Sequence, residues 1–345
     1  MKIAVIAVLL SGDTGGAERF YCGLTKSLSD AGMETDLLQI VSDESNFESI
    51  KDTYLKFYDL NVKNYDGVIS TKSPSYLVRH TNHVCYLLHT MRVFYDMFES
   101  EFPNPHPSML EQRKYINALD NAALSPVRIK KIYSIGHEVA DRLYKYNLLK
   151  SEVLHPALSF DNFKTGESHD YIFMPGRLHR WKRVDLIINA MQYVKSPVKF
   201  KIAGTGEDEG FFRKIANCDP RIEFLGRITD DDLIDLYANS LAVPFIPIRE
   251  DYGYVTLEAF KSCKPVITCK DSGEPAFFIK NGFNGFVCDP KPQDIAEKID
   301  YLFNNRDKAV TMGLNGKSSI AHISWANIAQ QLIRALEPEN DRSKK

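Results

Sequence analysis

The strongest constraint on the fold is a regular alternation of short apolar runs and helix-spaced segments in the second half of the chain. Beyond Asp170, each run that suits a buried strand is followed by a stretch with apolar residues at helical spacing. This alternation is typical of a doubly wound α/β fold, in which helices cover both faces of a parallel sheet. The predicted strands are 171–174, 198–203, 222–225, 241–246 and 265–268, and the predicted helices are 184–192, 208–216, 230–239 and 255–263.

The first half of the chain predicts a second sheet of the same class. The apolar run from Ile3 to Leu10 suits the first strand of a parallel sheet, and a helix reaching about Leu28 follows it. The segment His155-Pro156-Ala157-Leu158 indicates a hinge. Further strands are expected at 35–41, 67–70, 84–88 and 122–124, with a further helix at 136–146.

The length of the chain agrees with two domains, because 345 residues suffice for two separate cores. We predict one α/β domain over residues 1–155 and a second over 156–335. The remaining residues, 336–345, are charged and are expected to fray.

Composition excludes several classes of function. The formal net charge is −2 and no basic stripe is present, which argues against a nucleic-acid partner. The six cysteines have no metal-ligand spacing and suit the core of a protein in a reducing compartment. The apolar run at the amino terminus is too short for a membrane span, and its flanks do not make a signal peptide. We therefore expect a cytoplasmic protein that at most rests on the inner face of a membrane.

The most informative motif is an acidic loop followed by a helix. Glu250 and Glu258 are separated by seven residues that include Tyr252, Gly253, Tyr254 and Val255. A strand, a tight loop and a new helix would turn both carboxylates towards a ligand at the amide-rich start of the helix. Alternatively, Glu258 complements the helix dipole and Glu250 is a solvated loop residue.

A basic loop occupies the corresponding place after an earlier predicted strand. Arg177 and Lys182 lie between the predicted strand 171–174 and the helix 184–192, where backbone N–H groups are also available. A guanidinium and an ammonium suit a diphosphate, although such residues also form ordinary basic surface loops.

Gly176-Arg177-Leu178, Lys182 and the Glu250–Glu258 pair together resemble the retaining glycosyltransferases of family 4, also called group 1. The resemblance covers roughly residues 1–335. It implies the GT-B fold, in which two Rossmann-like, doubly wound domains face each other across a cleft. The amino-terminal domain would then serve the acceptor and the carboxy-terminal domain the nucleotide sugar.

The resemblance also implies a reaction. A hexose would pass from a GDP- or UDP-linked donor to a glycan or lipid-linked glycan acceptor with retention, as in the assembly of cell-surface polysaccharides. No cofactor and no metal is implied, because Arg177 and Lys182 stabilise the leaving phosphate. Glu250 would hold a sugar hydroxyl and Glu258 the ribose. The implied donor-binding residues are Gly15, Gly16, Gly204, Tyr252, Gly253, Tyr254, Val255 and Glu258.

His89 extends the resemblance to the first domain. The stretch from His89 through Arg92 to Asp96 is similar to a signature of a mannosyltransferase-rich branch, His-Thr-Pro-x-Arg followed by aromatics and Asp. This chain lacks the proline, so His89 and Arg92 are one residue closer together than in the pattern. His89 is assigned to catalysis and the preference for mannose is carried as an expectation, whereas Arg92 and Glu274 receive no role.

Other interpretations stay open at this point. A nucleotide-sugar epimerase or a non-catalytic nucleotide-sugar-binding protein could use the same fold. The run Asp230-Asp231-Asp232 could in principle hold a metal, but its position before a predicted helix favours helix capping.

Overall fold

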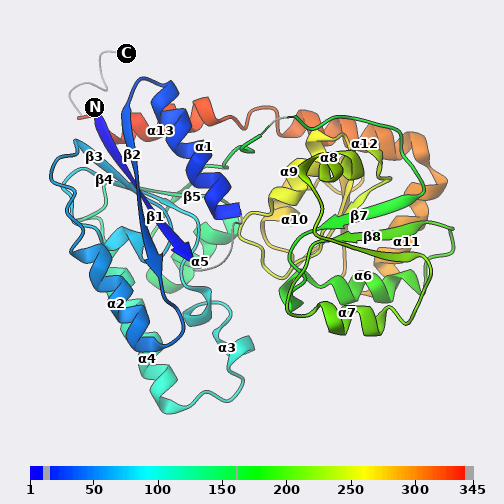
Figure 1. Ribbon diagram of the computed structural model, residues 1–345, viewed down its shortest axis with the longest axis horizontal. Coiled ribbons are helices and arrows are strands. Elements are labelled where there is room, and N and C mark those ends of the chain that lie inside the picture. The colour runs from blue at the N-terminus through cyan, green and yellow to red at the C-terminus, as the bar shows by residue number, and fades with distance from the viewer. Residues whose placement is uncertain (11–15, 161, 339–345) are drawn as a thin grey trace. The chain divides into compact units, whose positions relative to one another are not determined.

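A computed structural model describes residues 1–10, 16–160 and 162–338. The chain forms two compact units, each of the α/β class (Figure 1). The first unit comprises Met1–Ser159 together with the segment from Ile323 onward, and the second comprises Phe160–His322.

The core of the first unit is a six-stranded parallel sheet with the order β2-β1-β3-β4-β5-β6. Strand β1 pairs with β2 on one side and with β3 on the other, so the strand order reverses beside β1. Every side chain from Ile3 to Val8 is fully buried, as expected for a strand covered on both faces. The strands are β1 (Lys2–Leu10), β2 (Glu34–Ser42), β3 (Gly67–Ser70), β4 (His83–Leu87), β5 (Lys131–Ser134) and β6 (Glu152–Val153).

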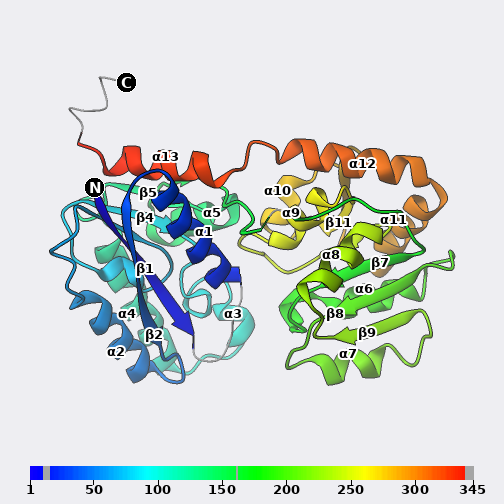
Figure 2. The same cartoon turned by 45° about the horizontal axis from the view of Figure 1, so that its top comes forward.

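The helices of the first unit include one from the far end of the chain. Helix α13 packs along α1, and Figure 2 shows the two side by side. The rings of Phe20 and Trp325 meet edge to face at 5.8 Å, and the Trp325 indole N–H donates to the Leu158 carbonyl at 2.9 Å. The helices are α1 (Gly16–Asp30), α2 (Phe47–Tyr58), α3 (Phe98–Glu101), α4 (Pro107–Ala123), α5 (His137–Asn147) and α13 (Trp325–Leu336), with short 3₁₀ turns at Ser75–Leu77 and Arg92–Phe94.

Two expectations from the sequence are therefore corrected. Residues 323–335 belong to the first unit instead of the second, because the apolar face of α13 is covered by α1. The first unit also continues to Ser159 before the second begins, instead of ending at residue 155. The strand expected at 122–124 is the end of α4, whose capping residue Leu124 is fully buried. A buried helix end leaves a short apolar run that looks like a strand in the sequence.

The second unit repeats the doubly wound plan. Strands β7, β8 and β9 form one parallel sheet and β10, β11 and β12 another. A parallel bridge between Ile172 and Ala242 joins β7 to β10, so the strand order runs β9-β8-β7-β10-β11-β12 and reverses between β7 and β10. The strands are β7 (Tyr171–Pro175), β8 (Lys199–Ala203), β9 (Ile222–Gly226), β10 (Val243–Pro244), β11 (Val266–Cys269) and β12 (Gly285–Cys288).

The predicted elements of the second unit all occur, with ends within two residues of those expected. Their apolar faces build one core that includes Ile172, Val184, Phe200 and Ile267. The helices are α6 (Val184–Met191), α7 (Glu209–Ile215), α8 (Asp230–Asn239), α9 (Tyr254–Lys261), α10 (Glu274–Phe278), α11 (Pro292–Asn304) and α12 (Arg306–Ser319), with a 3₁₀ turn at Arg180–Lys182.

Candidate functional site

The carboxyl ends of β7 and β10 mark the candidate site of the second unit. Open α/β sheets bind ligands where the strand order reverses, because the loops of the neighbouring strands diverge there. The loop after β7 carries Arg177 and Lys182, and the loop after β10 carries Glu250. The two motifs recognised in the sequence therefore emerge from neighbouring strands.

Lys182 and Glu250 form an ion pair across these loops. The Lys182 Nζ lies 2.6 Å from the Glu250 Oε2, and the two side chains are 26% and 21% exposed. The same ammonium lies 5.6 Å from the centroid of the Phe245 ring, within range of a cation–π interaction. Both predicted catalytic groups are thus brought together, with part of each still open to solvent.

The backbone of Glu250 is held between the loops. Its N–H donates to the Ser272 carbonyl at 2.9 Å, and its own carbonyl accepts from the Glu274 N–H at 2.9 Å. On the other side, the Ile248 N–H donates to the Trp181 carbonyl at 2.8 Å. The loops after β7, β10 and β11 therefore form one hydrogen-bonded platform, and this contribution of the third loop was not predicted from the sequence.

Helix α9 begins at Tyr254, directly after its capping residue Gly253, within the acidic motif. Gly253 has a φ of 78°, and a Cβ at this position would lie 2.6 Å from the Phe245 ring, so both the backbone and the space demand glycine. Tyr252 is buried and contacts Tyr254 edge to face at 5.0 Å. Burial, followed by the charge of Glu258, raises the pKa of Tyr254. Val255 follows in the first turn of the helix and is half-buried.

Glu258 lies in α9 and is only 7% exposed. Its Oε2 accepts a hydrogen bond from the Tyr237 hydroxyl of α8 at 2.6 Å. Tyr237 is itself fully buried, so the direction of the carboxylate is fixed by the packing of two helices. This partner was not predicted, because the two residues are 21 positions apart and belong to no common motif.

Arg177 pairs with Glu207, whereas Lys182 pairs with Glu250. Its side chain is 62% exposed, and its Nε donates to Glu207 Oε2 at 3.1 Å. His179 Nε2 lies 3.4 Å from the same carboxylate, and burial lowers the pKa of His179. Gly204, at the end of β8, donates its N–H to the Gly226 carbonyl at 2.7 Å. The structure thus places Arg177 and Lys182 in one loop with separate ion pairs.

In the first unit, His89 lies two residues beyond β4. Its Nδ1 is 2.8 Å from the Thr90 carbonyl. Because a carbonyl can only accept, Nδ1 carries the proton in this contact. The His89 carbonyl in turn accepts from the Ser73 N–H at 3.1 Å, which fixes the backbone at the strand's carboxyl end.

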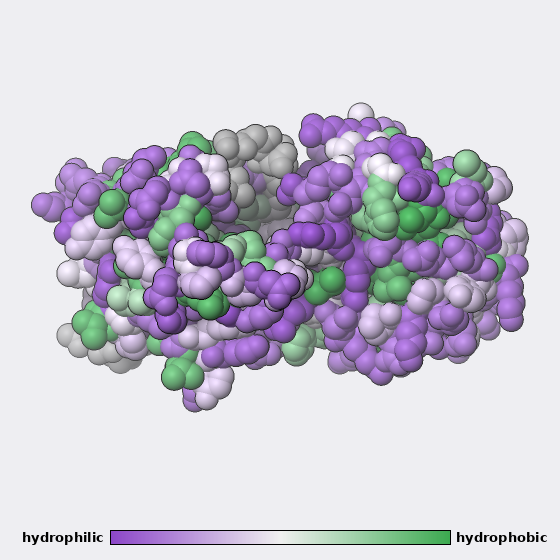
Figure 3. All heavy atoms as spheres, turned by 90° about the horizontal axis from the view of Figure 1, so that it is seen from below, coloured by the Kyte–Doolittle hydropathy of each residue, from purple (hydrophilic) through white to green (hydrophobic). Residues whose placement is uncertain are grey.

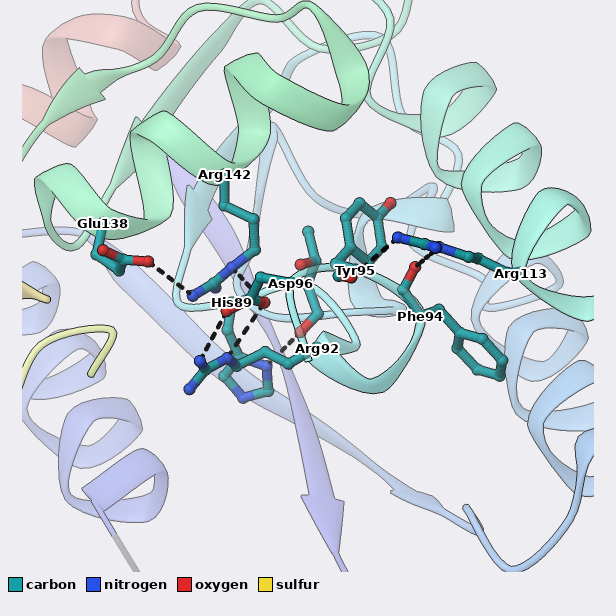
Figure 4. A network of polar contacts seen from close by, with 9 residues as sticks. His89, Arg92, Phe94, Tyr95, Asp96, Arg113, Glu138 and Arg142 are labelled. Carbon is teal, nitrogen blue, oxygen red and sulfur yellow. Dashed lines mark hydrogen bonds and ion pairs between the residues drawn. The ribbon is translucent and has the colours of Figure 1, made fainter. Parts of the chain in front are cut away.

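A buried ion network shapes the loop that follows His89 (Figure 4). Asp96 accepts from Arg92 at 2.7 Å through Oδ2 and lies 2.7 Å from Arg142 Nε through Oδ1. The side chains of Asp96 and Arg142 are 1% and 0% exposed, and Glu138 lies 3.8 Å from Arg142. Arg92, which received no role from the sequence, is therefore one arm of an interior network, and Arg142 was missed entirely.

A second buried carboxylate supports the same loop. Asp120 of α4 accepts from the Tyr54 hydroxyl at 3.0 Å and from the Tyr95 hydroxyl at 2.7 Å. Burial raises the pKa of Asp120 to about 6, against the opposing effect of the tyrosine hydrogen bonds. Tyr54 also lies 3.1 Å from Ser73, so Asp120 links α2, α4 and the loops after β3 and β4.

The remaining expectations have simple outcomes. Gly15 lies outside the described residues, and Gly16 is the first residue of α1. The aspartate run caps α8: Thr229 Oγ1 accepts from the Asp232 N–H at 3.1 Å, and the Asp232 carboxylate accepts from the Thr229 N–H. All six cysteines are free; four are buried, but Cys22 and Cys218 are exposed, so these two are not core residues as expected.

Within residues 1–10, 16–160 and 162–338, no helix combines the length and the apolar character needed to cross a bilayer. Hydrophilic residues dominate the face shown in Figure 3, and hydrophobic residues form small separate groups on it.

Comparisons with known proteins point to one family. Residues 159–319 match the model of the glycosyl transferases group 1. An uncharacterized glycosyltransferase of Methanocaldococcus jannaschii, MJ1178, is 28% identical over 203 residues, which are 57% of this chain and 53% of that protein. The mouse alpha-1,3/1,6-mannosyltransferase ALG2 is 33% identical over 100 residues, which are 29% of this chain and 24% of that protein. The chain thus matches about half or less of the length of these two relatives.

A solved structure extends the likeness to both units. The Anabaena protein HepE, in complex with UDP and glucose, superposes with a TM-score of 0.72 over 96% of this chain and 99% of that one, at 16% identity. The fold is therefore GT-B, as expected, with two Rossmann-like units.

Proposed function

Because this chain is a group 1 glycosyltransferase, we propose that it moves a hexose from a UDP- or GDP-linked donor to a glycan or lipid-linked glycan acceptor, with retention of configuration. Mannose is favoured as the sugar, which the signature beginning at His89 and the similarity to a mannosyltransferase support. HepE was solved with UDP and glucose, which supports a nucleotide-sugar donor.

The observation that carries the proposal is the pairing of Lys182 with Glu250 at 2.6 Å, at the point where the strand order reverses. A glycosyl donor needs a cation at its leaving phosphate and an acceptor group for its sugar hydroxyls, and both must lie within the span of one sugar phosphate. A lysine and a glutamate in contact, each partly open to solvent, meet that requirement.

Lys182 would stabilise the leaving phosphate. Departure of a nucleoside diphosphate concentrates negative charge on the phosphate oxygens while the anomeric carbon becomes cationic. An ammonium placed at these oxygens lowers the energy of the transition state without a metal ion. Arg177 would add a second positive charge, but it must first leave Glu207. We therefore propose a metal-independent reaction.

Glu250 and Glu258 would recognise the two ends of the donor. Glu250 would accept a hydrogen bond from a sugar hydroxyl once the phosphate takes its lysine. Glu258, whose carboxylate is oriented by Tyr237, would accept from the ribose hydroxyls. The amides at Gly253 and Tyr254, at the start of α9, would hold the sugar and the phosphate. His89 would take part in catalysis, as the family resemblance implies.

A transfer assay tests this proposal. The purified chain is incubated with UDP- or GDP-linked mannose and glucose, with and without a candidate glycan acceptor, in excess chelator. We expect acceptor-dependent release of the nucleoside diphosphate at a rate close to that without chelator, and NMR of the product should show the donor's anomeric configuration. Loss of most activity on chelation, restored by Mn²⁺ or Mg²⁺, would contradict metal independence. A new nucleotide sugar formed from donor alone would indicate an epimerase.

A further inference from the structure

We propose that Arg183 is a positioning residue that locks together the loops carrying Lys182 and Glu250. Arg183 belongs to neither sequence motif, yet it follows Lys182 directly and its side chain reaches both other loops of the platform. The inference rests on the donor site proposed above, because positioning has meaning only if Lys182 and Glu250 bind a ligand.

All three nitrogens of the Arg183 guanidinium donate hydrogen bonds. Its Nη1 and Nη2 form a fork to the Asp271 carboxylate at 2.8 Å each, in the loop after β11. Its Nε donates to the Ile246 carbonyl at 2.7 Å and its Nη2 to the Pro247 carbonyl at 2.8 Å, in the loop after β10. Charge-assisted forks of this kind fix geometry as well as adding energy.

The backbone of Arg183 is held in a conformation that arginine seldom adopts. Its φ is 50° and its ψ is 42°, in the left-handed region where a side chain other than glycine is disfavoured. Strain of this kind persists only where surrounding contacts compensate it, and it is concentrated at functional sites. The side chain, only 12% exposed, supplies those contacts.

A chain of contacts leads on from Asp271, the partner of Arg183, to Glu250. The Asp271 carbonyl accepts from the Arg249 N–H at 2.9 Å, and the following residues Ser272 and Gly273 bridge to Glu250. A Cβ on Gly273 would lie 2.5 Å from the Glu250 carbonyl oxygen, and the φ of Gly273 is 74°, so the approach requires glycine. Arg183 is thereby linked to Lys182 through the chain and to Glu250 through the third loop.

The chain contains a matched control. Arg221 also forks to an aspartate, with Nε and Nη2 at 3.1 and 2.8 Å from Asp219, and it donates to the carbonyls of Val194 and Met191. It stands just before the edge strand β9, at the amino ends of the strands, whereas the candidate site lies at the carboxyl ends of β7 and β10. The two arginines therefore share their bonding and differ in their distance from the candidate site.

The experiment compares Arg183→Gly, Arg183→Lys and Arg221→Lys in the full chain. Glycine removes the guanidinium and also relieves the strain of the left-handed backbone conformation. Lysine keeps the positive charge but cannot form the two parallel hydrogen bonds to Asp271. Binding of UDP, GDP and inorganic pyrophosphate is measured by calorimetry, together with the urea midpoint and with kcat and KM for the donor.

We expect both Arg183 variants to weaken binding of the nucleoside diphosphate by about tenfold and to lower kcat/KM by about 10- to 100-fold per folded molecule. Arg221→Lys should lower the urea midpoint but leave binding and kcat/KM unchanged. Normal binding and turnover by folded Arg183→Gly would overturn the positioning role while leaving the donor site intact. Wild-type protein that binds none of the three probes would overturn the donor site itself, and the positioning role with it.

Discussion

The two units use charged pairs in opposite ways. In the second unit, Lys182 and Glu250 meet on loops and remain 26% and 21% exposed, so a ligand can take the place of either partner. In the first unit, Asp96 and Arg142 are 1% and 0% exposed and lie behind the loop that carries His89. A ligand cannot reach the second kind of pair, which instead fixes the shape of the backbone.

Exposed and buried ion pairs affect stability differently. An exposed pair contributes little to stability, because solvent screens it and its side chains lose entropy. Removing one partner of a buried pair is strongly destabilising, because the other charge is left unpaired in a region of low dielectric. Substitutions at the buried pair of the first unit should therefore appear as lost stability, and substitutions at the candidate site of the second unit as lost activity.

The largest effect is expected from Arg142→Met. Without this guanidinium, the buried Asp96 keeps only Arg92 of the two arginines that contact it, and we expect the free energy of unfolding to fall by about 3 kcal/mol or more. Urea unfolding followed by circular dichroism measures this loss. The double variant Arg142→Met, Asp96→Leu should recover part of it. A loss below about 1 kcal/mol would place this pair in the same class as the exposed pairs.

Lys182→Ala should show the reverse pattern. The ammonium is lost from the proposed leaving phosphate, so we expect transfer to slow by about 100-fold or more. The free energy of unfolding should change by less than about 1 kcal/mol, because the pair with Glu250 is partly exposed. Arg177→Ala, which removes a more exposed cation from the same loop, is the matched control and should slow transfer less. A folded Lys182→Ala protein with normal turnover would remove the lysine from the phosphate site.

A pH titration tests the buried carboxylate of Asp120 in the first unit. Burial raises the pKa of Asp120 from 3.8 to about 6, so the folded state favours the protonated acid. The stabilising contribution is complete below the unfolded pKa and is lost as pH rises through the folded pKa. Relative to Asp120→Asn, the wild-type free energy of unfolding should fall on the order of 2 kcal/mol between pH 4 and pH 6. Parallel pH profiles of the two proteins would contradict the raised pKa.

The smallest effect is expected from Glu250→Gln, which tests whether a phosphate replaces Glu250 as the partner of Lys182. Glu250 competes with phosphate for Lys182, so Glu250→Gln should tighten binding of the bare nucleoside diphosphate by up to about fivefold. Turnover should fall, because the proposed acceptor for the sugar hydroxyl is lost. Calorimetry with UDP and GDP measures the first effect and the transfer assay the second. Weaker binding of the bare nucleotide would indicate that Glu250 contacts the nucleotide directly.

The sequence predicted the candidate site of the second unit far better than the buried ion network of the first unit. Lys182, Glu250 and Gly253 belong to short motifs bounded by glycine and by periodic segments, and these signals are local. Arg183 could have been suspected only from its place beside Lys182, because its partners are 63 to 89 positions away. Arg142 and Asp96 are joined by tertiary packing alone.

The first unit also shows why helix α4 was missed. Its first residue is Pro107, capped by the His106 ring that accepts from the Ser108 N–H, and the proline-rich stretch before it predicts a loop. Its buried face is narrow, with Ile116, Asp120 and Ala123 among the buried residues, so helical periodicity is weak. A buried aspartate on that face, Asp120, removes the apolar signal at a fully buried position.

The return of α13 to the first unit has a consequence for biosynthesis. The second unit, Phe160–His322, is inserted within the sequence of the first, so it is synthesised in full before the last helix of the first unit. Until Trp325 emerges, the face of α1 at Phe20 and Gly23 stays uncovered. A domain that begins with residue 1 is thus finished last, and a chain truncated shortly before Trp325 should present a folded second unit beside an unfinished first one.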